Sequence, residues 1–117
     1  MKYKRKSDFL TPLDVRLLPE MDDQHWQLLA PLGYYSELLQ REIWVPTYYI
    51  TNFASCKPVK YSAIRPTVIH DYLYDSKEVP RIVADAVMLE AMHVIKMNEL
   101  LAHGMHQGVE IFGGSHY

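Results

Sequence analysis

The stretch that decides the fold is residues 66–97, which read PTVIHDYLYDSKEVPRIVADAVMLEAMHVIKM. Its apolar residues recur at helical spacing. Pro66 and Pro80 each stand where a helix can begin, because the first helical turn does not need the N–H that proline lacks. The stretch therefore predicts one helix from about Pro66 to Asp75 and a second from Pro80 to about Met97. Their short connection predicts that the two helices pack as antiparallel neighbours.

The residues before this stretch carry strand signals. The run 43–50 is rich in β-branched and aromatic residues, with Pro46 expected at a sheet edge or a bulge. Turn-forming residues at 19–23 and at Gly33 separate the strand-like runs within residues 9–51. These patterns predict a small antiparallel sheet of three or four strands.

The residues after Met97 predict a third helix that ends at Gly113 and Gly114. Its apolar stripe consists of Leu100, Leu101, Met105, Val109 and Phe112. The whole pattern predicts an α+β fold, a small antiparallel N-terminal sheet packed on two or three C-terminal helices. We expect residues 1–117 to form a single domain, with residues 1–8 as a flexible basic arm.

Composition narrows the class of protein. Apolar residues make up 49% and charged residues 22% of the 117 residues, as in an ordinary globular domain. The net charge of −2 does not favour binding to nucleic acid. The basic start, Lys2 to Lys6, is read as a solvated terminus or as a contact arm for an acidic partner. No apolar run approaches the roughly 20 residues of a membrane span.

Two features bear on localisation. The basic start is followed by Ser7 and Asp8 rather than by an apolar run, so no signal peptide is expected. Cys56 is the single cysteine and cannot form an internal disulfide. Both features favour a reducing compartment or an assembled particle over secretion.

Candidate chemistry concentrates at His70, Asp71 and Asp85. Antiparallel helices could bring Asp85 to the imidazole of His70, where a carboxylate would set the tautomer and stabilise the imidazolium. Asp71 is rotated about 100° from His70 on the same helix and is available to ligate a hard cation such as calcium. The alternative is a satisfied polar contact in the core. Arg81 is a rival partner for either aspartate.

Other candidates carry weaker signals. The spacing of His103 and His106, with His93 nearby, permits zinc, but no Glu or Cys completes a motif. Cys56 could act as a thiol nucleophile with His70, although a lone cysteine is more typical of packing. The pairs Tyr34-Tyr35 and Tyr48-Tyr49 suit a ligand groove, a protein interface or the cover of a thin sheet.

Several short motifs occur together in one order along residues 9–113. They are Val45-Pro46, Thr51-Asn52-Phe53-Ala54-Ser55, Val68-Ile69-His70-Asp71-Tyr72-Leu73-Tyr74, Arg81 with Ala84-Asp85, and Val109-Glu110-Ile111-Phe112-Gly113. This combination resembles a phage and prophage family that is named as a domain of unknown function. More distantly, it resembles the secretory phospholipase A2 enzymes of bacteria and fungi, which carry an HD-x-x-Y helix, a second helix with an Asp and a late V-x-IFG.

The resemblance to phospholipase A2 implies a role for each matching residue. His70 would be the general base for water, Asp85 would orient it, and Asp71 would bind calcium. Further calcium ligands would come from the segment of Asn52 and Phe53. Asn52 stands where those enzymes have an aspartate, and an uncharged amide lowers the expected affinity for calcium. The stapling cysteines are absent, and Tyr48-Tyr49 replaces the Gly-Phe of the phage family.

Two functions are therefore predicted. The first is a phage-encoded, phospholipase-like ester hydrolase, with calcium as cofactor and a phospholipid membrane as partner. The alternative is a catalytically silent structural component of the virion, in the tail or baseplate, that contacts other virion proteins. A small effector that binds a host protein is a third reading.

Overall fold

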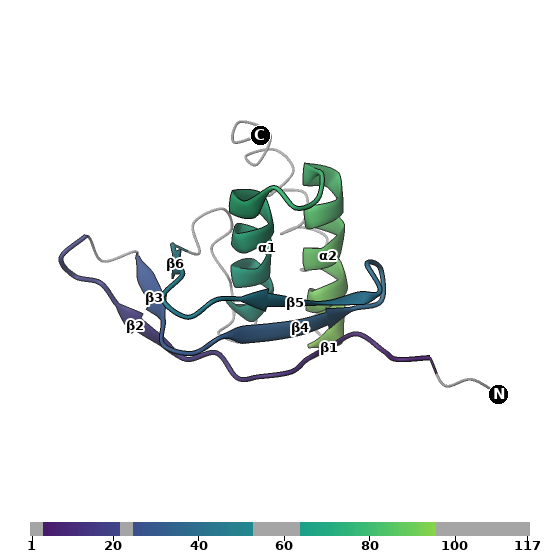
Figure 1. The fold of residues 1–117 in the computed structure, drawn as a ribbon, viewed down its shortest axis with the longest axis horizontal. Helices are drawn as coiled ribbons and strands as arrows, with labels where there is room; N and C mark the ends of the chain where they lie inside the picture. Colours follow the sequence, from purple (N-terminus) through teal and green to yellow (C-terminus); the bar gives the residue numbers. More distant parts are fainter. Residues whose placement is uncertain (1–3, 22–24, 53–63, 96–117) are drawn as a thin grey trace.

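The structure is a computed structural model, and it describes residues 4–21, 25–52 and 64–95. Figure 1 shows two helices side by side, standing on the strands that precede them in the sequence. This confirms the predicted α+β class, with the sheet-forming part N-terminal to the helices. The predicted third helix, the basic start at 1–3 and Cys56 lie outside the described residues.

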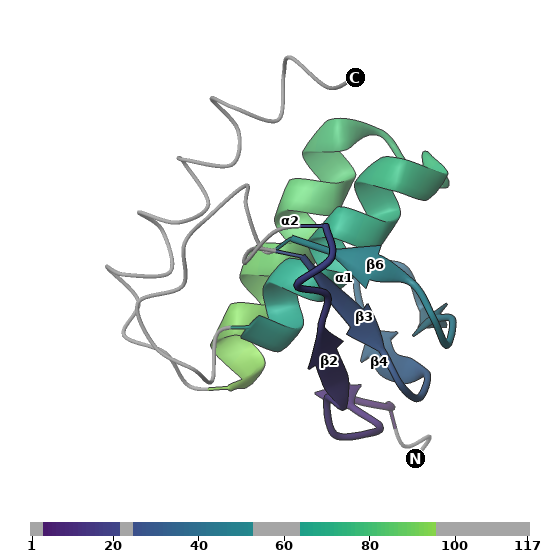
Figure 2. The same cartoon turned by 90° about the vertical axis from the view of Figure 1, so that its left-hand side faces the viewer.

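The strands form two separate antiparallel sheets rather than the single sheet that the sequence predicts. One sheet has the order β1-β4-β5 and the other the order β2-β3-β6. The bounds are β1 Asp8–Phe9, β4 Leu32–Ser36 and β5 Arg41–Val45 in the first, and β2 Val15–Leu17, β3 Trp26–Leu28 and β6 Ile50–Thr51 in the second. Figure 2 shows β2, β3 and β6 together on the side of the molecule turned toward the viewer.

A turn within residues 43–50 explains why there are two sheets. Pro46 directly follows the last residue of β5 and cannot donate to a strand ladder. Tyr48 has a left-handed φ of 73°, and its N–H donates to the Leu28 carbonyl at 2.8 Å. The chain therefore leaves the first sheet after Val45 and joins the second one at β6, so the run is two strands rather than one.

Both helices begin where their prolines predict. Helix α1 spans Ile64–Ser76 with Pro66 in its first turn, and Lys77 follows it with a φ of 53° that ends the helix. Helix α2 spans Arg81–Val94, and the Pro80 carbonyl accepts the first helical hydrogen bonds. Among the described residues, neither helix has the length and apolar character needed to cross a membrane.

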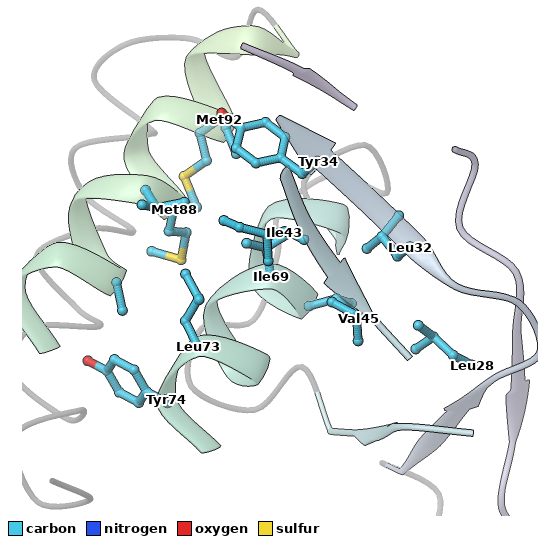
Figure 3. Close-up of a cluster of buried hydrophobic side chains, with 14 residues drawn as sticks. Leu28, Leu32, Tyr34, Ile43, Val45, Ile69, Leu73, Tyr74, Met88 and Met92 are labelled. Carbon is cyan, nitrogen blue, oxygen red and sulfur yellow. The ribbon is translucent and has the colours of Figure 1, made fainter. Parts of the chain in front are cut away.

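The core lies between the β1-β4-β5 sheet and the two helices. Figure 3 shows Ile43 from the sheet meeting Ile69 of α1 and Met88 of α2. The buried face of α2 is formed by Ala84, Asp85, Val87, Met88, Ala91 and Met92. The helical spacing of Ile82, Ala86 and Leu89 predicts that Ile82 faces the core, and this prediction is wrong, because Ile82 is 68% exposed. Asp85 is buried on the face of α2 that small residues and methionines form.

Candidate functional site

His70 and Asp85 meet at the interface of the two helices. The His70 Nε2 lies 2.8 Å from the Asp85 Oδ1, and the side chains are 1% and 0% exposed. The short connection of residues 77–80 returns the chain so that these positions face each other. The predicted contact is confirmed, and Asp85 takes His70 rather than Arg81 as its partner.

Tyr74 completes this group from the same helix as His70. Its hydroxyl donates to the Asp85 Oδ1 at 2.8 Å, and its ring centroid lies 3.9 Å from that of His70. Sequence reasoning missed this hydrogen bond. The signal was the spacing, because residues four apart on a helix can reach the same point on a neighbouring helix.

The two donors set the chemistry of the Asp85 carboxylate. A buried ionised carboxylate needs such hydrogen bonds, since desolvation otherwise disfavours its charge. With Oδ1 as acceptor, the His70 Nε2 carries the ring proton and Nδ1 is the basic nitrogen. The second oxygen, Oδ2, is buried and has no hydrogen-bond partner within the part of the chain that the structure describes.

Asp71 lies toward β6 and contacts the segment that the resemblance assigns to calcium. The Thr51 hydroxyl donates to the Asp71 Oδ2 at 2.5 Å, and the Asn52 backbone N–H also donates to this carboxylate. Burial raises the pKa of Asp71, and the nearby charge of Asp75 acts in the same direction. The Thr51 hydrogen bond and the His70 charge partly oppose this rise.

A second tyrosine ties the β6 segment to α1. The Tyr49 hydroxyl donates to the Asp75 Oδ2 at 2.5 Å, and its ring meets Tyr72 edge to face at 5.6 Å. Burial of the Tyr49 phenol, with the hydrogen bond to Asp75, raises the pKa of Tyr49. Tyr49 therefore positions the segment, whereas its neighbour Tyr48 is 70% exposed.

Within the described residues, the groups around Asp71 do not by themselves form a calcium site. Calcium needs six to eight oxygen ligands, whereas the described neighbours of Asp71 present O–H and N–H donors. Asn52 approaches through its N–H, and Phe53 lies outside the described residues. Across residues 4–21, 25–52 and 64–95, no group of three or more His, Cys, Asp or Glu gathers in a way that could hold a metal.

The remaining sequence candidates are placed only in part. His93 is an exposed residue in the last turn of α2. Its predicted zinc partners, His103 and His106, fall outside the described residues, as does the candidate thiol Cys56. These predictions stay as sequence hypotheses.

Comparison with known proteins bears on this geometry. Residues 26–109 match the family described as "Protein of unknown function (DUF1353)". The chain belongs to this family. The DUF1353 match spans β3 to β6 and both helices, so the His70, Tyr74 and Asp85 group lies inside the shared domain. No curated protein and no solved structure matched the chain.

Proposed function

We propose that this DUF1353 protein is a phage-encoded hydrolase of phospholipid esters, with His70 as its general base and Asp85 as the residue that orients the base. The observation that carries the proposal is the buried contact of 2.8 Å between the His70 Nε2 and the Asp85 Oδ1. A general base needs a fixed tautomer and a nearby carboxylate to stabilise the charge that it gains, and this pair supplies both.

The proton path follows from the direction of these hydrogen bonds. Nε2–H donates to Asp85, so Nδ1 accepts a proton as a water oxygen bonds to the ester carbonyl carbon. The imidazolium formed in this step is stabilised by the Asp85 carboxylate. When the ester C–O bond breaks, His70 returns the proton to the departing alcohol oxygen. Tyr74 acts through Asp85, because its hydroxyl holds Oδ1 at 2.8 Å.

The assay of this proposal is run with and without calcium. The resemblance assigns it to Asp71 and the segment of Asn52 and Phe53. Asp71 does contact this segment, which supports a shared site. However, its carboxylate accepts hydrogen bonds there, and a bound cation would have to replace at least one of them. The proton path described above therefore involves only this chain's own residues.

The test is release of fatty acid from vesicles of phosphatidylethanolamine and phosphatidylglycerol, with calcium and with a chelator. The wild type should release fatty acid, whereas His70→Asn should lose at least about 100-fold in rate, the usual contribution of a general base. His93→Asn is the matched control, because His93 is an exposed histidine of α2. Absence of turnover under both conditions, or equal turnover by His70→Asn, would contradict the proposal.

One observation favours the alternative of a structural virion component of the tail or baseplate. His70 and Asp85 are almost fully buried, as a pair that only clamps two helices would be. This alternative predicts that Asp85→Ala lowers the melting temperature while no substrate is turned over. It also predicts a fixed number of copies in purified particles, so absence of the protein from particles would count against it.

A further inference from the structure

A groove of about 770 Å³ runs along α2 on the face of Ile82, away from the core. Ile82 is 68% exposed, and Leu38, in the loop between β4 and β5, is 54% exposed. The described lining of the groove does not include His70 or Asp85, so the groove is separate from the candidate catalytic pair. Its aliphatic side chains are those of Leu38, Ile82, Ala86, Leu89 and Val94.

The polar side chains of the lining gather at the C-terminal end of α2, where the helix lies against β1 (Figure 1). The Glu37 N–H donates to the Ser7 Oγ at 2.8 Å. The Leu38 N–H donates to the Glu90 Oε2 at 2.9 Å. These two hydrogen bonds hold the segment before β1, the loop after β4 and α2 together. The polar lining residues are Lys6, Ser7, Glu37, Glu90 and His93.

The groove is therefore apolar at one end and polar at the other. Ile82 lies eight positions before Glu90 (90 − 82), which is about 12 Å along a helix with a rise of about 1.5 Å per residue. A partner helix that binds in a groove uses apolar anchors along its whole length, so it would need an apolar lining from end to end. The division into two ends fits a molecule with one polar head and one apolar tail.

The charges at the polar end indicate which kind of head fits. Lys6 is cationic and Glu37 is anionic, and neither forms an ion pair with another residue of the described part of the chain. A phosphate can pair with the Lys6 ammonium, and an amine can pair with the Glu37 carboxylate. A fatty acid fits less well, because its carboxylate would meet the like charge of Glu37.

We propose that this groove binds lysophosphatidylethanolamine, a phospholipid with one tail and a zwitterionic head. Its tail lies along Ile82, Ala86 and Leu89, which form a single row on the helix, and its head lies between Lys6 and Glu37. The volume of about 770 Å³ falls within the range of about 300–1,000 Å³ that is typical of small-molecule sites. Binding in this groove does not depend on hydrolysis at His70.

The test is calorimetric titration of the full-length protein with an ether-linked lysophosphatidylethanolamine below its micelle concentration. The ether analogue has no ester to hydrolyse, so the result is independent of the proposed catalysis. The wild type should bind one molecule saturably, and Ile82→Ser should weaken binding by about 10-fold, as expected when a covered apolar side chain is lost. Ile50→Ser is the matched control, because Ile50 is 39% exposed and is not among the lining residues.

Equal binding by Ile82→Ser would overturn the proposal. Absence of saturable binding by the wild type would also overturn it and would favour a protein partner for the groove.

Two head-group variants test the assignment of the charges. Glu37→Gln should weaken binding of lysophosphatidylethanolamine by about 2- to 5-fold, the range of a partly exposed ion pair. It should not weaken binding of ether-linked lysophosphatidic acid, which has the phosphate but no amine. Lys6→Gln should weaken binding of both lipids. If Glu37→Gln weakened both lipids equally, or if neither variant changed either affinity, the proposed placement of the head would be overturned.

Discussion

Removing the Tyr74 hydroxyl tests whether the buried carboxylate depends on its second donor. In Tyr74→Phe the ring is kept, so its packing on His70 at a centroid distance of 3.9 Å is retained. The lost interaction is one hydrogen bond of 2.8 Å to the Asp85 Oδ1. A hydrogen bond to a charged group contributes about 1.5–3 kcal/mol, and burial of Asp85 places this one in that range. We expect the free energy of unfolding to fall by about 2 kcal/mol.

Urea denaturation at neutral pH measures this change, with an unchanged m-value as evidence that both proteins unfold in the same way. Tyr72→Phe is the matched control on the same helix, because Tyr72 is half-buried and contacts Tyr49 through its ring. We expect the control to change stability by less than about 0.5 kcal/mol. If the Tyr74 variant were as stable as the control, the hydroxyl would not support Asp85 and the reasoning would be refuted.

Three further predictions concern Gly33 in the sheet and the carboxyl groups of Glu90 and Asp71. Gly33→Ala would place a Cβ 2.5 Å from the Trp44 ring, so the ring should move. We expect a red-shifted tryptophan emission and a free energy of unfolding that is lower by about 1–3 kcal/mol. Glu90→Gln leaves one side-chain oxygen to accept from both the Tyr34 hydroxyl and the Leu38 N–H. Urea denaturation should show a free energy of unfolding that is lower by about 1–2 kcal/mol. Burial raises the pKa of Asp71 above its ordinary 3.8, so ionising this carboxyl in the folded state costs stability. In urea denaturation below about pH 3.8, Asp71→Asn should therefore have the same free energy of unfolding as the wild type. As the pH rises from there through the raised pKa, the variant should become more stable than the wild type. A stability difference that shrinks with rising pH would contradict the shift.

The helical half was predictable because its signals are local. Pro66 and Pro80 mark helix starts whatever packs around them, and a short connection leaves two helices little choice but to run antiparallel. The contact between His70 and Asp85 followed from that geometry. Its roles in catalysis stay predictions.

The remaining features depended on contacts that sequence periodicity does not contain. Helix α2 is apolar on two faces, and packing of small residues and methionines, such as Ala84 and Met88, selected the buried one instead of the face of Ile82. The break into two sheets depended on the left-handed φ of Tyr48, a conformation that a tyrosine rarely adopts. The hydrogen bond of Tyr74 required the position of a carboxylate on another helix.

The most direct test of the proposed chemistry compares fatty acid release by the wild type, Asp85→Asn and Tyr74→Phe on the same phospholipid vesicles. An amide keeps the shape of Asp85 but cannot stabilise the imidazolium of His70 by charge. The account predicts that Asp85→Asn loses at least about 100-fold in rate while Tyr74→Phe loses less. Wild-type turnover that persists unchanged in Asp85→Asn, or no turnover by the wild type with or without calcium, would contradict it.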